Sequence, residues 1–228
     1  MPDKEKYLVI VAGGKGLRMG SAVPKQFLPL CGKPLLYYAI MAFKNAFPDI
    51  KIIMVLPAEH ISYAQMVLQA FPERIDVTIV AGGETRFHSV QNGMKQVHDD
   101  AVVFVHDGVR PLVSAELIRR CYEQAVEKGS AIPAIAVKDS VRMLDEDGSN
   151  PIDREQLRII QTPQTFRSEI LLPAFAQEYD PSFTDEATVA EAAGLEVHLI
   201  EGERNNIKVT TPEDMVVAEA LMNSAMAQ

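Results

Sequence analysis

A glycine-rich stretch near the start of the chain carries the first residues that could do chemistry. Residues 10 to 34 read IVAGGKGLRMGSAVPKQFLPLCGKP, and no Asp or Glu occurs between Lys6 and Pro48, although the formal net charge of the chain is -9. Glycines that follow a first strand let exposed backbone N–H groups approach a phosphate. Arg18 offers a planar guanidinium and Lys25 a compact charge, and both suit a displacement at the phosphorus of a triphosphate. The missing carboxylates therefore predict that a polyanion binds here.

The spacing of these glycines excludes two common nucleotide-binding loops. A dinucleotide-binding loop needs Gly-x-Gly-x-x-Gly and an acidic residue about 20 positions further on. Met19 stands where the third glycine would be, and the next acidic residue is Asp49. No Gly-x-x-x-x-Gly-Lys-Ser/Thr register fits a P-loop either. The stretch is thus a different kind of phosphate-binding loop.

Further candidate residues follow later in the chain. Asp107 ends the apolar run VVFVH, where a carboxylate would face a ligand crevice and meet magnesium or a hydroxyl; an ordinary Asp-Gly turn is the alternative. Strand alternation points His106 the other way, which favours a structural histidine. Ser89 either caps the helix that follows it or binds a nucleotide. Lys208, in the run NIKVT, and Arg154 suit the orientation of an incoming anion, and surface cations are the alternative interpretation.

The elements that must position these residues are a buried sheet and the helices between its strands. Short apolar runs rich in β-branched residues predict strands over Tyr7–Ala12, Ile52–Leu56, Val77–Ala81, Val102–His106, Ala131–Val137 and Val197–Ile200. Strands that alternate with helices imply an α/β fold, a doubly wound, mostly parallel sheet in a single domain over residues 1–228. Because ligands of such sheets gather at the carboxyl ends of strands, the loops after residues 12, 81 and 106 are expected to share one crevice.

Three helices have recognisable ends in the sequence. Pro34 is expected at the first position of a helix over Leu35–Asn45. Ser114 is expected to cap a helix over Ala115–Lys128, which is followed by a glycine. The run Thr211-Pro-Glu-Asp predicts a capping box that opens a final helix.

One segment interrupts this alternation. Residues 138–158 are polar, contain an Asp-Gly turn and predict a β-hairpin arm that stands off the core. A solvated surface hairpin and a dimerisation arm are equally compatible with the sequence.

Composition narrows the classes of protein. The 228 residues, 47% hydrophobic and 23% charged, are enough to bury a sizeable core. A pI near 5.1 argues against broad nucleic-acid or anionic-membrane binding. The N-terminal MPDKEK lacks the features of a signal peptide, and the longest apolar stretches are too short to span a bilayer, so a cytoplasmic protein is expected. Cys31 and Cys121 form neither a disulfide framework nor a zinc motif.

Six runs that occur in order resemble one family. The opening AGGKGLRMG with PKQF resembles the nucleotidyltransferases that activate sugar and polyol phosphates. The runs GGETRFHSV, VHDGVRP, TPQTF, FTDEA and NNIKVTTPED narrow the resemblance to the 2-C-methyl-D-erythritol 4-phosphate cytidylyltransferases, from about residue 8 to about residue 218. This resemblance implies a Rossmann-like nucleotidyltransferase fold, a homodimer joined by the hairpin arm, a divalent cation (normally Mg²⁺), and transfer of CMP from CTP to the polyol phosphate with release of pyrophosphate.

The resemblance also implies roles for individual residues. Arg18 and Lys25 would stabilise the transition state, and Arg154 and Lys208 would position the substrate phosphate. The nucleotide would be held by Ala12, Gly13, Gly14, Gly16, Gly83 and Ser89. The polyol phosphate would be held by Asp107, Arg110, Ser140, Thr162 and Thr184, some of them from the partner subunit, with Asp107 also meeting the metal. Because the nucleophile is already a phosphate oxyanion, positioning and electrostatics would supply most of the catalysis.

Three positions depart from the commonest pattern of that family, and three alternatives stay open. Asn205 stands where an Asp is frequent, which leaves Asp107 and the phosphates to hold the ion; Ser140 replaces a frequent Thr, and AGG replaces AAG. The alternatives are a cytidylyltransferase for another polyol phosphate such as ribitol 5-phosphate, a guanylyl- or uridylyltransferase for a sugar 1-phosphate, and a non-catalytic nucleotide-binding module. Retention of Arg18 and Lys25 together counts against the last.

Overall fold

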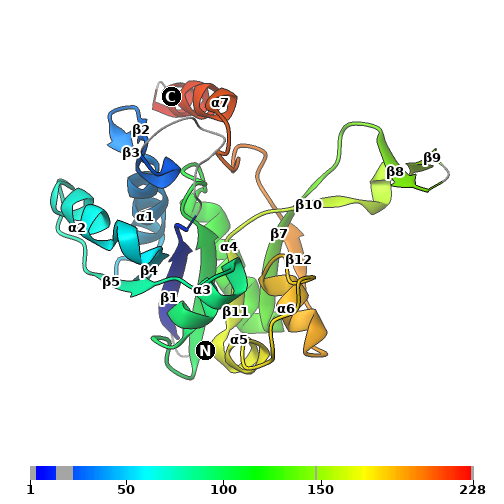
Figure 1. Cartoon of the computed structure of the whole chain (residues 1–228), viewed down its shortest axis with the longest axis horizontal. Coiled ribbons are helices and arrows are strands. Elements are labelled where there is room, and N and C mark those ends of the chain that lie inside the picture. Colours follow the sequence, from blue (N-terminus) through cyan, green and yellow to red (C-terminus); the bar gives the residue numbers. More distant parts are fainter. Residues whose placement is uncertain (1–3, 14–22, 147, 227–228) are drawn as a thin grey trace.

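The protein is built around one central sheet. The computed structural model describes residues 4–13, 23–146 and 148–226, and within them the sheet has eight strands, with the order β10-β7-β11-β6-β1-β4-β5 and β12 paired to β7 (Figure 1). The strands are β1 (Glu5–Val11), β4 (Lys51–Leu56), β5 (Val77–Ala81), β6 (Ala101–Asp107), β7 (Ser130–Ala136), β10 (Arg158–Ile160), β11 (Gln164–Arg167) and β12 (Leu199–Glu201).

Most of the sheet is parallel. Strand β1 runs parallel to β4 and β6, β4 to β5, and β12 to β7. Strand β11 is inserted antiparallel between β6 and β7, and β10 is antiparallel to β7. The prediction of a doubly wound, mostly parallel α/β sheet is confirmed.

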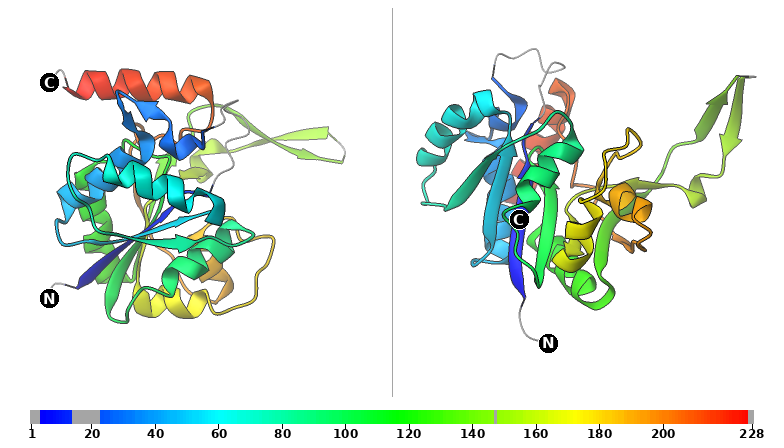
Figure 2. Two further views of the ribbon diagram at one scale, coloured as in Figure 1. Left: turned by 60° about the vertical axis from the view of Figure 1, so that its left-hand side comes forward. Right: turned by 60° about the horizontal axis from the view of Figure 1, so that its bottom comes forward.

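The helices cover both faces of this sheet (Figure 2). They are α1 (Leu35–Ala46), α2 (Ile61–Gln69), α3 (Arg86–Met94), α4 (Ala115–Lys128), α5 (Ser168–Ala174), α6 (Glu186–Ala192) and α7 (Pro212–Met226). Side chains of β1 alternate between two cores: Leu8 and Ile10 pack with α1 and α4, whereas Tyr7 and Val9 pack with α3, α5 and α6. Helix α7 packs with a small hairpin formed by β2 (Pro29–Leu30) and β3 (Lys33–Pro34).

The six predicted strands are present with shifts of a few residues at their ends, and β5 has the predicted bounds. Strands β10 and β11 were not predicted. Three of the four residues of the run Gln164–Arg167 are polar, so it gives no apolar signal, yet Gln164 and Thr165 are buried. The amide of Gln164 is satisfied inside the protein, because it donates to Asp185 Oδ2 at 2.9 Å and accepts from the N–H of Ala187 at 2.8 Å.

The predicted helix ends are confirmed in two of three cases. Ser114 Oγ accepts from the N–H of Leu117 at 2.9 Å and caps α4, which ends at Lys128 as predicted. Thr211 Oγ1 accepts from the N–H of Asp214, whose carboxylate accepts from the N–H of Thr211, so the capping box opens α7. Pro34, in contrast, stands before α1 with an extended ψ of 146°, because it pairs within the β2–β3 hairpin.

The segment after β7 forms the predicted β-hairpin. Strands β8 (Val141–Asp145) and β9 (Gly148–Ile152) pair with each other and with no other described strand. They project away from the sheet in every view of the ribbon (Figures 1 and 2). We call residues 138–158 the arm; it also contains the short helix η4 (Arg154–Gln156).

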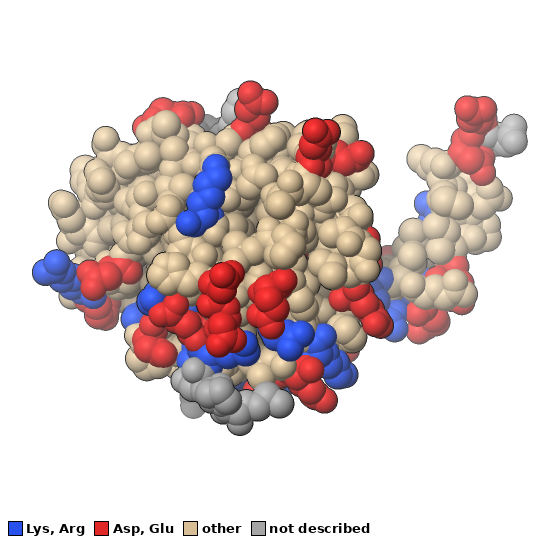
Figure 3. All heavy atoms as spheres, turned by 90° about the horizontal axis from the view of Figure 1, so that it is seen from below, with Lys and Arg blue, Asp and Glu red and all other residues tan. Residues whose placement is uncertain are grey.

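The charged surface is mixed in sign on the side opposite α7. Seen from below, Lys and Arg side chains lie among Asp and Glu side chains, and the described residues form no broad basic area on this face (Figure 3). None of the helices formed by the described residues combines the length and apolar character needed to cross a membrane.

Candidate functional site

A pocket of about 580 Å³ opens at the carboxyl ends of the parallel strands. It is lined by the ends of β1 and β6, the loops after β4 and β5, the start of α3, the short helix η2 (Lys25–Phe27) and Lys208. The prediction that the loops after residues 12, 81 and 106 share one crevice is confirmed. Ligand sites of α/β sheets form at this edge.

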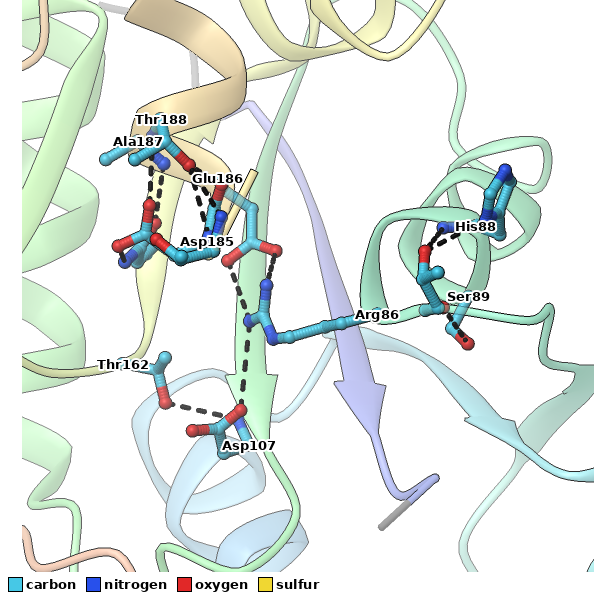
Figure 4. A network of polar contacts seen from close by, with 12 residues as sticks. Arg86, His88, Ser89, Asp107, Thr162, Asp185, Glu186, Ala187 and Thr188 are labelled. Carbon is cyan, nitrogen blue, oxygen red and sulfur yellow. Dashed lines mark hydrogen bonds and ion pairs between the residues drawn. The ribbon is translucent and has the colours of Figure 1, made fainter. Parts of the chain in front are cut away.

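Asp107 is the electrostatic centre of the pocket. Its Oδ2 lies 3.0 Å from Lys208 Nζ and 3.5 Å from Arg110 Nε. Its Oδ1 lies 3.7 Å from Arg86 Nη2, a contact drawn in Figure 4. Burial alone would raise the pKa of Asp107, but Arg86, Lys208 and Arg110 hold it well below its usual range. Three cations thus converge on one carboxylate, where an anionic ligand could also meet them.

Arg86 is held by a second, fully buried carboxylate. Glu186 at the start of α6 is 0% exposed and accepts from both terminal nitrogens of Arg86 at the start of α3, with Nη2 to Oε2 at 2.9 Å. Burial tends to lower the pKa of Arg86, but Glu186 and Asp107 raise it above its usual range. Sequence reasoning gave neither Arg86 nor Glu186 a role. Arg86 lies in the run GGETRFHSV and Glu186 in the run FTDEA, and membership of these runs was the signal that could have drawn attention to them. Their contact, however, joins positions 100 residues apart.

The segment that carries Lys208 is hydrogen-bonded to residues beside the pocket. Arg110 Nη1 donates to the carbonyl of Asn206 at 2.8 Å, and Asn206 Nδ2 donates to the carbonyl of Thr162 at 2.8 Å. Thr162 Oγ1 accepts from the N–H of Asp107 at 3.1 Å. The structure thus brings Asp107, Arg110, Thr162 and Lys208 together, as predicted from the family pattern. Arg110 and Thr162 are buried in the wall beside the pocket.

His106 is a structural residue, as the strand alternation predicted. Its Nε2 lies 3.2 Å from the carbonyl of Arg110, and its Nδ1 lies 3.1 Å from Thr162 Oγ1. Since a carbonyl can only accept, Nε2 carries the proton and Nδ1 accepts from the Thr162 hydroxyl. Burial lowers the pKa of His106 to about 4, so the ring is neutral at pH 7.

The glycines after β5 are packed against the first turns of α3. Ser89 Oγ accepts from the N–H of Gly83 at 3.1 Å and donates to the carbonyl of Thr85 at 2.9 Å. Thr85 is the residue that caps α3, so the interpretation of Ser89 as a helix cap is wrong: Ser89 lies inside the helix. A Cβ on Gly83 would lie 2.4 Å from His88 Cβ. Gly83 is therefore required by packing, and both Gly83 and Ser89 line the pocket.

The first loop contributes Ala12, Gly13 and Lys25 to the pocket. Gln26, to which the sequence gave no role, is fully buried, and its Nε2 donates to the carbonyl of Ala12 at 2.6 Å. This bond ties the turn that carries Lys25 to the end of β1. The candidates Gly14, Gly16 and Arg18 lie outside the described residues.

Four candidates stand away from the pocket of their own chain. Arg154 donates from Nη1 to the carbonyl of Lys138 at 2.7 Å, at the base of the arm. The others are exposed: Ser140 in the same arm, Thr184 before α6, and Asn205 in the loop before Lys208. None of the four lines the pocket.

The described residues do not form a metal site by themselves. They contain no group of three His, Cys, Asp or Glu side chains that could hold an ion. Asp107 is the carboxylate predicted for this role, and both of its oxygens face cations. An ion in the pocket would need most of its ligands from a bound phosphate chain.

Comparison with known proteins agrees on one family. The chain matches the family model IspD: 2-C-methyl-D-erythritol 4-phosphate cytidylyltransferase over residues 7–224. Enzymes of that name from Bacteroides thetaiotaomicron and Bacteroides fragilis are 47% and 49% identical, covering 96% and 94% of this chain and 100% and 98% of theirs. The crystal structure of 4-diphosphocytidyl-2C-methyl-D-erythritol synthase from Anaerococcus prevotii superposes with a TM-score of 0.81 at 27% identity, covering 96% of this chain and 99% of its own.

Proposed function

The chain belongs to the 2-C-methyl-D-erythritol 4-phosphate cytidylyltransferase family, and from this premise we propose that it transfers CMP from CTP to 2-C-methyl-D-erythritol 4-phosphate, a step of isoprenoid precursor synthesis. The products are CDP-methylerythritol and pyrophosphate. The observation that carries the proposal is the pocket in which Lys25, Lys208 and Arg86 surround the carboxyl ends of β1 and β6. Lys25, Arg86 and Lys208 supply fixed positive charge for two phosphate groups that must meet, and Glu59, Glu84 and Asp107 also line the pocket.

The chemistry requires positioning more than proton transfer. An oxygen of the acceptor phosphate attacks the α-phosphorus of CTP, and the bond from that phosphorus to the oxygen bridging to the β-phosphate breaks as pyrophosphate leaves. The attacking oxygen is already anionic, so no general base is needed. Lys25 would stabilise the charge that spreads over the α-phosphate, and Lys208 would orient the acceptor phosphate. Arg18 is proposed to act with Lys25.

The nucleotide side of the reaction fits the part of the pocket between β1 and α3. Ala12 and Gly13 stand at the end of β1, and Gly83 and Ser89 stand opposite them in the same pocket. Backbone N–H groups and a hydroxyl provide neutral donors and acceptors for a base, a ribose and phosphates. We propose that CTP lies between these two walls.

The acceptor side is proposed to be completed by a second copy of the chain. Arg154 and Ser140 belong to the arm, which stands away from its own pocket, and the arm exposes Met143 and Leu144, with 80% of Leu144 accessible. Exposed apolar side chains on a projecting hairpin favour an interface over a solvated surface. A homodimer joined by the arms would bring Arg154 to the partner's pocket.

A divalent cation, normally Mg²⁺, is part of this proposal. The ion would enter with the triphosphate, because the described residues contain no group of three His, Cys, Asp or Glu side chains that could hold it, and Asp107 already faces three cations. When bound, it would neutralise phosphate charge. A cytoplasmic location is proposed as well, since both cysteines are free thiols, which suits a reducing compartment.

The proposal is tested by measuring pyrophosphate release from CTP and Mg²⁺. Methylerythritol phosphate and ribitol 5-phosphate are offered in separate reactions, and a reaction without acceptor is the control. Release with methylerythritol phosphate alone is the expected result. A preference for ribitol 5-phosphate would overturn the proposed acceptor, and binding of CTP without any turnover would overturn the enzymatic function.

A further inference from the structure

The first turns of α3 connect the two halves of the site. On one side, Ser89 and Gly83 bond to each other beside the nucleotide pocket. On the other side, the Phe87 ring lies 5.0 Å from that of Phe175 and 5.4 Å from that of Phe183, in the loop that leads to α6. Gln91 Nε2 also donates to the carbonyl of Phe175 at 2.7 Å. These contacts already dock the loop on α3 without any charged group.

An ion pair also joins the start of α3 to the start of α6. Arg86 and Glu186 each begin a helix, and the two oxygens of Glu186 accept from the two terminal nitrogens of Arg86 (Figure 4). The carboxylate is 0% exposed, whereas 28% of the Arg86 side chain remains open on the pocket side. A buried ion pair is a weak source of stability, because the cost of desolvation offsets the attraction. A role in the charge balance of the pocket explains it better.

Arg86 and Lys208 share the same carboxylate. Arg86 Nη2 lies 3.7 Å from one oxygen of Asp107, and Lys208 Nζ lies 3.0 Å from the other. Glu186 fixes the guanidinium by two bonds, so Arg86 stays beside Asp107 whatever binds in the pocket. Without Arg86, only Arg110 and Lys208 would share the charge of Asp107, which would then hold the Lys208 ammonium group back more strongly from an incoming phosphate. The side chain of Lys208 is 45% exposed and is the more accessible partner.

We propose that Glu186 is a positioning residue for the acceptor half of the reaction. It holds Arg86 against Asp107, Arg86 offsets the charge of Asp107, and Lys208 is thereby left able to bind the acceptor phosphate. This inference rests on the proposed function, because it assumes that Lys208 meets that phosphate. Glu186, the first residue of α6, does not line the pocket. Its substitution is nevertheless expected to change the kinetics of one of the two substrates, the acceptor.

The test compares Glu186→Gln with the double variant R86M/E186L. Three properties are measured for each: CTP binding (its Kd), acceptor kinetics (KM together with kcat) and the melting temperature. Glu186→Gln is expected to lower kcat/KM for the acceptor by about tenfold or more and to change the Kd for CTP by less than about twofold. Glu169→Gln is the matched control, since Glu169 lies 3.2 Å from Arg167 in an ion pair outside the pocket and its loss is expected to change none of the three.

The double variant separates a positioning role from a structural one. An apolar pair of similar volume is expected to keep or raise the melting temperature, while kcat/KM for the acceptor stays about tenfold low or lower. Wild-type kinetics in the stable double variant would overturn the inference, and so would a parallel loss of CTP affinity in Glu186→Gln. Failure of the proposed function is distinguishable, because the wild-type protein itself would then release no pyrophosphate with methylerythritol phosphate.

Discussion

The pocket and the arm hold their charged side chains in opposite ways. In the pocket, Asp107 is buried among Arg86, Arg110 and Lys208, and further bonds fix Arg86 to Glu186 and Arg110 to the carbonyl of Asn206. In the arm, Arg154 is half exposed and contacts residues of the arm itself, the carbonyl of Lys138 and the carboxylate of Glu155. The first region is preorganised by its own chain, whereas the second has no described contact that would fix it for chemistry.

In the homodimer proposed above, this difference would divide the reaction between two chains. The groups proposed for the nucleotide converge inside one chain, but two of the groups proposed for the acceptor stand on a hairpin that pairs only with itself. Preorganised groups lower the activation barrier because they need not move into place during the reaction. We therefore infer that one chain supplies the groups of the nucleotide half by itself, and that the acceptor half also needs residues of the partner chain.

The largest effect is expected from Lys25→Ala, which removes a charge from the preorganised region. We expect kcat to fall by about 10²–10³-fold, because the charge acts on the transition state, while the Kd for CTP changes little. Arg18→Ala is expected to behave alike. Kinetics and calorimetric titration of CTP measure the two quantities, with Lys128→Ala on the exposed end of α4 as the control. Comparable losses in kcat and in CTP affinity would assign Lys25 to ground-state binding.

The next effect concerns the division between chains. Arg154→Ala is expected to lower acceptor kcat/KM by about tenfold or more. Mixing it in equal amounts with Lys25→Ala should restore about a quarter of wild-type activity, because half of the dimers are mixed and each holds one intact site. The mixture is assayed after denaturation and joint refolding, with Arg158→Ala as the control. Absence of recovery would mean that Arg154 serves the pocket of its own chain.

A smaller effect is expected from pH, which changes the stability of the protein through His106 beside the pocket. His106 has a pKa of about 4 in the folded protein against an ordinary value of 6.5, so the unfolded chain binds more protons between these values. The contribution of His106 to the free energy of unfolding is therefore fully present above about pH 6.5. It decreases as the pH falls, by about 2 kcal/mol between pH 7 and pH 5. Urea unfolding at both pH values measures this loss.

His106→Gln should flatten this pH dependence, because the group that gains a proton on unfolding is gone. His98→Asn is the control, since its imidazole is 75% exposed. An unchanged slope in His106→Gln would show that another group causes the acid loss.

The smallest effect on the fold is expected in the arm. Leu144 is 80% exposed and lies on a hairpin outside the core, so Leu144→Asp should change the unfolding free energy of the chain by less than about 0.5 kcal/mol. It should nevertheless abolish the dimer, as measured by analytical ultracentrifugation, and leave CTP binding intact. Leu199→Asp, at an exposed position off the arm, is the control. A dimer that persists in Leu144→Asp would place the interface elsewhere.

The fold was predictable where burial leaves a pattern in the sequence. Continuous β-branched runs mark the parallel strands because these strands are buried on both faces, and Ser114 and Thr211 mark helix starts because capping bonds are local. Strand β11 escaped prediction because Gln164 is satisfied by contacts to α6 that no local pattern shows.

The site followed the same rule. Asp107 and Lys208 were predicted from strand ends and motifs, and the structure places them 3.0 Å apart. The Arg86–Glu186 pair was missed because it exists only once two helices are packed. The roles of the candidate residues remain predictions for the kinetic experiments above.

The antiparallel strand β11 has a consequence for how the chain folds. Strands β6 and β7 follow each other in the sequence, yet β11 lies between them and pairs with both. During synthesis, β6 and β7 therefore emerge well before the strand that joins them, and the arm must be made in between. The half of the sheet built by β1, β4, β5 and β6 can assemble first, and β7 can be joined to β6 only once residue 167 has left the ribosome.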